Sequence, residues 1–439
     1  MMERRDFLRA GAVATCGSVL PGLFGCSTGA SINSTPVTFD SAETWAMVPE
    51  ILAKIVPPTF PNRDFSILDY GASHGRGSNA QPGIAAAIQA CSAAGGGRVV
   101  IPAGSYTCNG PIHLLSNVNL YLAKGALVRF SDNPDDYLPV VEVRYIGIRC
   151  MNYSPFIYAN NQENIAITGS GTFDGQSSSA WATWVSRQDA AYTKLAQDGA
   201  SGVPVSNRVY GTGYYLRPTM LEPYSCKNIL IEGVTFRGSA FWTLHPTFCT
   251  NVTIQNVKVQ PGIANDDGCD PDSCTNVLVQ HCTFQTNDDN ISVKAGSGKD
   301  THGLPSCSDI VFQNCATTGT NFGSFSIGTN VSGGVNNVFV EGFSAGACQN
   351  AYLIKGNRNL GGQVSDIHIR NSSASECHHL LSLLPGYFTS TAFSSDVPQV
   401  GPVSMQNMSC TNASVSIFEF SGYSYEPIFG VYISIRLPS

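Results

Sequence analysis

The chain of 439 residues is 43% hydrophobic and only 13% charged, and it carries a formal net charge of −7 at pH 7. This composition excludes a disordered chain, and no apolar run reaches the roughly 18 residues that a membrane-spanning helix of the mature protein needs. The net negative charge offers no basic field, so we expect no nucleic acid partner.

The first 26 residues have the features of a targeting signal. In ERRDFLRAGAVATCGSVLPGLFGC a pair of arginines precedes an apolar segment, which resembles a bacterial twin-arginine signal peptide. LFGC also resembles a lipoprotein box, in which cleavage leaves Cys26 lipidated; ordinary cleavage nearby is the alternative. We expect export to the periplasm, to the outer membrane as a lipoprotein, or out of the cell, with membrane attachment only through Cys26. The polar residues 27–61 are interpreted as a tether.

The cysteines are expected to be reduced. Without Cys16 and Cys26, 13 of the 15 remain, an odd number. Twin-arginine substrates fold in the reducing cytoplasm, so most of these thiols should be small buried apolar groups. Spacings such as that between Cys269 and Cys274 do not fit a zinc site, and we assign no metal and no cofactor.

Residues 64–128 predict a strand, a helix and further strands. Ile84, Ile88 and Cys91 fall on one face of the helix, and the glycines at 95–97 end it. We interpret this segment as a cap over the N-terminal end of a β-structure, where an open sheet edge would invite aggregation.

A short unit then recurs along the chain. Each unit starts with Asn or Asp and continues with β-branched residues that alternate with polar ones, as in NVTIQNVKV. The units begin at Asn164, Asn228, Asn251, Asn276, Asp309, Asn337 and Asp366. Strands repeating every 23 to 33 residues after the first gap predict a parallel β-solenoid, so we expect one domain over residues 62–439, by default a monomer.

The repeat lapses between Gln176 and Pro218, where aromatic residues are frequent. Two interpretations stay open for this insertion. Its aromatic side chains either form the wall of a sugar-binding cleft or pack against one another in a surface loop.

Six aspartates crowd into 24 positions: Asp266, Asp267, Asp270, Asp272, Asp288 and Asp289. Like charges at close range repel unless they hold a cation or carry out proton chemistry. Asp267 and Asp288 occupy similar phases of consecutive coils, about 4.8 Å apart along the axis, so their carboxyl groups should lie about 5 to 9 Å apart. Alternation would bury Asp289 beside Ile291 and point Lys294 outward. We therefore expect a turn that brings both Asp288 and Asp289 to the surface.

Several ordered motifs resemble the polygalacturonase family, glycoside hydrolase family 28. NDDGCDPDSC and NDDNISVKAG resemble its two aspartate segments, and FSILDYGA, CKNILIEGVTFRGSAFWTLHP and LIKGNRNLGGQVSDIHIRN extend the resemblance over about residues 64–375. The resemblance implies an all-β fold, a right-handed parallel β-helix with an N-terminal helical cap, and inverting hydrolysis of a pectic polysaccharide.

The resemblance also implies roles for single residues. Asp288 would be the general acid, and Asp267 and Asp289 the bases that orient and deprotonate the attacking water. Lys355 would pair with a substrate carboxylate, and Asn265 and Arg358 would be further substrate contacts.

Other polar residues near the motifs are interpreted as structural. We expect Asp270 and Asp272 to bond turn backbone, His245 to be structural and Trp242 to lie in the core. His281 is expected to face solvent or a loop. His302 follows Lys294 in a loop, and its spacing does not decide whether it reaches the cleft.

The chain departs from the family at two positions. GTNFGSFSIGTN offers Phe322, Gly323 or Ser324 where the family has a histidine, and Leu353 stands where it has an arginine. Loss of the histidine removes a group that tunes the general acid, and loss of the arginine removes a bidentate contact to a uronate carboxylate. They imply either another substrate, such as a rhamnogalacturonan-type chain, or a weakened enzyme.

Three functions are compatible with the sequence. The first is hydrolysis of a galacturonate-containing polysaccharide. The second is a β-helix polysaccharide lyase, whose acidic cluster would hold calcium. The third is a surface protein that binds pectin without turnover.

Overall fold

The computed structural model describes residues 42–75, 77–320, 322–388, 396–421, 428 and 431–436. The chain divides into two units, Met1–Thr38 and Phe39–Ser439, and all described residues belong to the second. The predicted signal, the lipid site at Cys26 and the first part of the tether lie outside the described residues. No helix among the described residues is long and apolar enough to cross a membrane.

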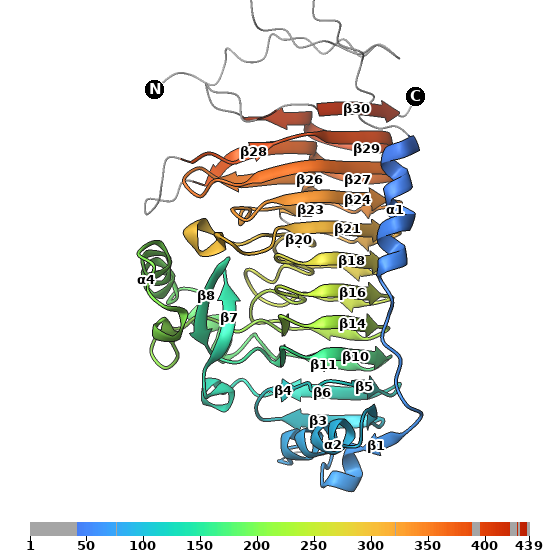
Figure 1. Cartoon of the computed structure of the whole chain (residues 1–439), viewed down its shortest axis with the longest axis vertical. Coiled ribbons are helices and arrows are strands. Elements are labelled where there is room, and N and C mark those ends of the chain that lie inside the picture. Colours follow the sequence, from blue (N-terminus) through green and yellow to red (C-terminus); the bar gives the residue numbers. More distant parts are fainter. Residues whose placement is uncertain are drawn as a thin grey trace, which may run out of the picture. The chain divides into compact units, whose positions relative to one another are not determined.

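The second unit is a parallel β-helix, as the repeats predicted (Figure 1). Its first wall contains β1 (Asp64–Ser66), β2 (Gly97–Ile101), β5 (Val118–Leu122), β10 (Glu163–Gly169), β14 (Lys227–Glu232), β16 (Thr250–Gln255), β18 (Thr275–Gln280), β21 (Cys307–Gln313), β24 (Val335–Glu341), β27 (Gln363–Phe388), β29 (Val403–Phe420) and β30 (Val431–Arg436). The second wall contains β3 (Gly104–Cys108), β6 (Ala126–Phe130), β11 (Thr172–Asp174), β15 (Thr235–Arg237), β17 (Lys258–Val259), β19 (Thr283–Phe284), β22 (Ala316–Thr317) and β25 (Ser344–Ala345).

The third wall holds the aspartate motifs. Its strands are β4 (Ile112–His113), β9 (Ile157–Asn160), β13 (Leu221–Tyr224), β20 (Ser292–Val293), β23 (Gly323–Ile327) and β26 (Cys348–Asn357). Between β13 and β20, single parallel bridges continue the ladder through Leu244, Cys269 and Ile291. The long strands β27 and β29 each continue from the first wall through the second and third walls of one coil, so β27 pairs in turn with β24, β25 and β26, and β28 (Gln399–Val400) pairs with β27.

The predicted unit starts are turns of left-handed backbone. All seven have a φ between 53° and 58°, a conformation that Asn and Asp tolerate better than other side chains. Stacked asparagines also bond to one another, as where the Asn228 amide donates to Asn164 at 3.0 Å and the Asn251 amide donates to Asn228 at 3.2 Å. The same residue type therefore sets the bend and links one coil to the next.

The interior of the coils is apolar. Aromatic rings stack from coil to coil, with the Phe173 centroid 6.1 Å from that of Phe130 and 5.4 Å from that of Phe236. All 13 cysteines of the described residues are free and buried. The prediction that these thiols pack in the core is confirmed for them.

The N-terminal cap is the helix α2 (Gln81–Ala93), followed by positive-φ glycines at 95–97. Its buried face includes Ile84, Ile88 and Cys91, as predicted from their spacing. The helix contacts the first strands of the β-helix (Figure 1). The remaining short helices are η1 (Ile67–Tyr70), η2 (Pro134–Tyr137), η3 (Val205–Asn207) and η4 (Gly298–Thr301).

The expected tether at 27–61 is wrong over part of its length. Residues Ala42–Lys54 form a helix, α1, which lies along the outside of the first wall (Figure 1). Trp45, Val48 and Ile51 are buried there against Val311 and Phe339. Their spacing of three residues makes one apolar helical stripe, and this stripe covers outward-facing apolar side chains of the wall.

The insertion and a preceding hairpin lie beside the third wall. The hairpin consists of β7 (Val141–Tyr145) and β8 (Ile148–Asn152), to which β12 (Val209–Tyr210) adds, and the insertion contains α3 (Ala180–Trp184) and α4 (Asp189–Ala200) (Figure 1). Trp181 and Trp184 are buried with centroids 5.0 Å apart, and Tyr215 packs on Trp184. This packing favours the interpretation in which the aromatic side chains stabilise the insertion itself.

Candidate active site

The aspartate motifs occupy successive rungs of the third wall. The Gly268 amide donates to the Asp289 carbonyl at 3.0 Å, and the Asn290 amide donates to the Gly323 carbonyl at 3.0 Å. Asp267, Asp289 and Gly323 therefore follow one another along the axis, each just before the point where its coil joins the wall. The sequence predicted this neighbourhood from the similar phase of the two motifs.

Asp267, Asp288 and Asp289 converge. One carboxylate oxygen of each lies within 4.8 Å of the others. Asp288 is half-buried, whereas Asp267 is 4% and Asp289 1% exposed. The expectation that both Asp288 and Asp289 reach the surface is wrong for Asp289, because Lys355 Nζ lies 2.7 Å from one of its oxygens and the Gly323 amide donates to the other at 2.9 Å. These contacts offset the cost of its burial.

Asp267 faces a second buried lysine. Lys294 Nζ lies 3.0 Å from an Asp267 oxygen, 2.9 Å from Ser292 Oγ and 4.2 Å from the centre of the Trp242 ring. Lys294 points away from the apolar interior, as the alternation predicted, yet it is only 2% exposed. Burial raises the pKa of Asp267 to about 7; the other two aspartates add to the rise and Lys294 opposes it.

Asp288 is held by hydrogen bonds instead of an ion pair. One oxygen accepts from the Asp289 amide at 2.9 Å and the other from the Asn265 side chain at 3.3 Å. The Asn265 oxygen accepts from Arg217 at 2.7 Å, and Arg217 in turn donates to Gln188 of the insertion. Arg217 thus turns the amide nitrogen of Asn265 toward Asp288. Burial, followed by the charge of Asp289, raises the pKa of Asp288.

The other three aspartates, Asp266, Asp270 and Asp272, differ in their hydrogen bonds to the backbone. Asp266 accepts three backbone hydrogen bonds, from Gly262, Asn287 and Asp288. Asp272 accepts one from the Gly296 amide at 3.0 Å, so its predicted bond to backbone is confirmed. The same prediction is wrong for Asp270, whose two oxygens have no hydrogen-bond partner among the described residues; one of them lies 3.7 Å from Lys294 Nζ.

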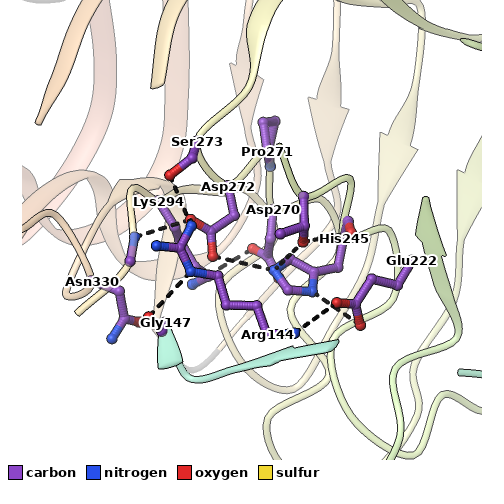
Figure 2. Close-up of polar contacts among 12 residues, drawn as sticks. Arg144, Gly147, Glu222, His245, Asp270, Pro271, Asp272, Ser273, Lys294 and Asn330 are labelled. Atoms are coloured by element: carbon purple, nitrogen blue, oxygen red, sulfur yellow. Dashed lines mark hydrogen bonds and ion pairs between the residues drawn. The ribbon is translucent and has the colours of Figure 1, made fainter. Parts of the chain in front are cut away.

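A buried ionic network lies next to this cluster (Figure 2). Arg144 of β7 donates to Asp272 at 2.9 Å and to Ser273 at 2.8 Å, and its own amide donates to Glu222 at 3.0 Å. His245 lies between the two acids, 3.6 Å from Glu222 and 3.4 Å from Asp272. Burial alone would lower the pKa of His245, but the two carboxylates raise it to about 9. The structural interpretation of His245 agrees with these contacts, and nothing in the sequence singled out Arg144 or Glu222.

Comparison with known proteins identifies the family. The sequence model described as glycosyl hydrolases family 28 matches residues 150–380, more than half of the chain. The chain belongs to glycosyl hydrolases family 28.

Proteins and solved structures that are similar to this family 28 member carry polygalacturonase names. It is 25% identical to a probable polygalacturonase of Vitis vinifera over 77% of this chain and 66% of that protein, and 26% identical to an endo-polygalacturonase of Pectobacterium carotovorum subsp. carotovorum over 63% and 65%. The chain thus spans just under two thirds of these relatives. The crystal structure of a hyperthermoactive exopolygalacturonase from Thermotoga maritima is similar with a TM-score of 0.77 and 28% identity, covering 89% of this chain and 96% of that one.

Gly323, one of the three positions at which the family histidine was sought, has no space for a side chain. A Cβ on Gly323 would lie 2.0 Å from Ser326 Oγ and 3.0 Å from Asp289 Oδ1. At this position the backbone amide, not a side chain, contacts Asp289. Leu353, which replaces the family arginine, is buried in register with Ser326.

Of the three predicted substrate contacts, Lys355 and Asn265 are bonded to the aspartates, whereas Arg358 is exposed. Lys355 is 7% exposed and its ammonium group is bonded to Asp289. Asn265 bonds Asp288, and Arg358 is exposed just beyond the end of β26. His281 and His302 are exposed as well, and Trp242 is buried, as expected. Two ammonium groups therefore offset two of the three carboxylate charges.

Proposed function

We propose that this chain hydrolyses glycosidic bonds of a galacturonate-containing pectic polysaccharide with inversion of configuration. The observation that carries the proposal is the convergence of Asp267, Asp288 and Asp289 within 4.8 Å. Membership of family 28 and the polygalacturonase names of the relatives support the choice of substrate.

Asp288 is proposed as the general acid. It is the most exposed of the three carboxyl groups, so it can reach a glycosidic oxygen, and burial together with Asp289 raises its pKa. A raised pKa favours the protonated form of a carboxyl group, and only this form can protonate the leaving group. The hydrogen bonds from Asn265 and the Asp289 amide hold the group in place during transfer.

Asp267 and Asp289 are proposed to hold the attacking water. A water that donates two hydrogen bonds of about 2.8 Å spans acceptors about 4.4 Å apart, which fits oxygens within 4.8 Å of each other. The oxygens of Asp288 and of the two proposed bases also lie within 4.8 Å of one another, which is shorter than the roughly 6.5–9.5 Å between acid and base in many inverting enzymes. Inversion therefore requires that a water held between Asp267 and Asp289 attacks the sugar, because direct attack by a carboxylate would give retention.

The remaining site residues are assigned by their contacts. Asn265 and Lys355 are proposed as positioning residues for Asp288 and Asp289, because those are the groups that they touch. Arg358 is exposed, and we propose it as a contact for a uronate carboxylate. Export through the signal at 1–26, with a lipid on Cys26, is part of the same proposal, since the substrate is a polymer outside the cell; mass spectrometry of the mature N-terminus tests it.

The lyase alternative is less favoured by the lysines. A lyase needs a base that removes a proton. Burial lowers the pKa of Lys294 and of Lys355, but their aspartate neighbours outweigh it and raise both, so the two buried amines are protonated at neutral pH. They neutralise the carboxylates and are poor bases.

The test is a panel of homogalacturonan, rhamnogalacturonan and xylogalacturonan, scored for new reducing ends and for product configuration by NMR. Asp288→Asn should lower kcat by about 10²–10⁴-fold, the usual contribution of a general acid. Asp69→Asn, an exposed aspartate of the cap, is the matched control. Activity on none of the substrates would favour the binding protein, and an unsaturated product lost with a chelator would favour the lyase. Retained configuration would contradict the assigned roles.

A further inference from the structure

Lys294 has a position that the proposed mechanism does not yet use. It pairs in register with Asp272 on the outer side of the third wall, and its ammonium group lies between two carboxylates, 3.0 Å from Asp267 and 3.7 Å from Asp270. The same ammonium nitrogen lies 4.2 Å from the centre of the Trp242 ring. A cation held on several sides keeps its place while chemistry proceeds beside it.

Asp270 is a buried acidic residue beside Lys294. It is fully buried, and neither of its oxygens has a hydrogen-bond partner within the described part of the chain. An unpaired buried charge is costly. Burial raises the pKa of Asp270 well above its ordinary value, and Lys294, whose ammonium group lies 3.7 Å from one Asp270 oxygen and is bonded to Asp267, opposes this rise more than any other group.

Asp267 needs a cation to act as a base. It is buried, and the charges of Asp288 and Asp289 favour its protonated form, which cannot bind water as a base. Lys294 is the group that opposes both effects most strongly, ahead of Lys355, which is bonded to Asp289.

We propose that Lys294, braced by Asp270, is a positioning residue that keeps Asp267 ionised and oriented toward the attacking water. This inference rests on the proposed hydrolytic function. Lys294 also supplies a positive charge beside the carboxylates in this chain, which has no histidine at positions 322–324. The charged and titratable groups that face Asp267 and Lys294 are Asp270, Asp272, Asp288, Asp289, Lys355 and His245.

Lys294→Met tests the proposal through the pH profile of kcat/KM. Without the cation Asp267 binds its proton more tightly, so the limb on which activity falls with decreasing pH should move to higher pH by at least about one unit. Lys294→Arg should retain most of the original limb. Lys258→Met, which removes an exposed lysine of β17, is the control and should leave the profile unchanged.

A second variant separates charge from folding. Lys294→Met with Asp270→Asn removes the ammonium group together with the buried carboxyl group beside it, so it should fold better than Lys294→Met while its limb stays shifted. Restoration of the original limb in this double variant, or an unshifted limb in a folded Lys294→Met protein, would overturn the proposal and leave Lys294 a structural residue.

An infrared titration of the carboxylates, with the Asp267 band assigned by Asp267→Asn, gives the same answer without substrate. A higher protonation midpoint in Lys294→Met supports the inference, and an unchanged midpoint refutes it. Inactivity of the wild-type protein on every pectic substrate would instead count against the proposed function, since the titration remains readable.

Discussion

Gly323→Ala tests whether a backbone amide sets the position of Asp289. Gly323 opens β23, and its amide donates to Asp289 Oδ1 at 2.9 Å. The added methyl carbon would lie 2.0 Å from Ser326 Oγ, 3.0 Å from Asp289 Oδ1 and 3.4 Å from Leu353 Cβ. Two of these distances are shorter than ordinary van der Waals contacts.

The sizes of the two clashes set the expected effect. Against ordinary contact at 3.4 Å, Ser326 Oγ must move by about 1.4 Å and Asp289 Oδ1 by about 0.4 Å. Ser326 Oγ has no hydrogen-bond partner in the described residues, so rotating it breaks no bond. Moving Asp289 strains its contacts to the Gly323 amide and to Lys355. We expect a stability loss of about 1–3 kcal/mol and a kcat lower by up to about 10²-fold, because small displacements of reacting groups are costly.

Three variants separate the two effects in one assay of reducing-end release and denaturant unfolding. Ser326→Ala removes a buried hydroxyl that has no partner among the described residues and should behave like the wild type. Gly323→Ala with Ser326→Ala removes the larger clash, so it should regain most of the stability but keep the low kcat. KM should change less than kcat in both Gly323 variants, since Asp289 is proposed to act on water and not on substrate.

Two outcomes would refute a positioning role for the Gly323 amide. A folded Gly323→Ala protein with wild-type kcat would show that the amide contact to Asp289 is dispensable. Recovery of the rate together with stability in the double variant would show that the effect ran through Ser326 and not through Asp289.

Two further predictions concern the buried network. Arg144→Met removes a partner from the fully buried pair with Asp272 and should lower the free energy of unfolding by about 3–5 kcal/mol in urea; a loss below about 1 kcal/mol would mean that His245 alone compensates Asp272. The pKa of His245 is raised from 6.5 to about 9 in the folded protein, so its stabilising contribution is complete below about pH 6.5 and disappears as the pH rises through about 9. His245→Gln should flatten the pH dependence of unfolding in that window, and an unchanged slope would contradict a charged His245.

Local chemistry made the coils predictable. An Asn or Asp that starts each unit occupies left-handed backbone because its short polar side chain tolerates it, and the alternation that follows needs only the two faces of a strand. The capping helix was found by the same local rule, from the spacing of Ile84, Ile88 and Cys91. The helix α1 was missed because composition was weighed above spacing, although Trp45, Val48 and Ile51 recur at helical intervals.

Long-range contacts limited the prediction of the site. Phase along the repeat was enough to bring Asp267 and Asp288 together. The burial of Lys294 was not predictable from its strand, since the side chain does point outward, and the groups that surround it include Asp267 and Asp270 of the preceding coil and Trp242 of the coil before that. The Glu222 carboxylate, which contacts Arg144 and His245, comes from a coil two turns before that of Asp272. Alternation specifies a face, but whether another segment covers that face depends on where an insertion folds.

The proton count of the site follows from its charges. Three carboxylates and the two lysines bonded to them sum to one negative charge, and the sum is zero when one carboxyl group holds a proton. A buried site that must admit an anionic uronate is more stable near neutrality. Asp267 and Asp289 each have an ammonium partner, whereas Asp288 has no ion pair within the described residues, so the ion pairs favour Asp288 as the protonated group; burial, which raises the pKa of Asp267 to about 7, acts against this order. The pattern of ion pairs therefore supports the proposed role of Asp288 as general acid, independently of any sequence motif, because Asp288 is the carboxyl group that neither lysine pairs with.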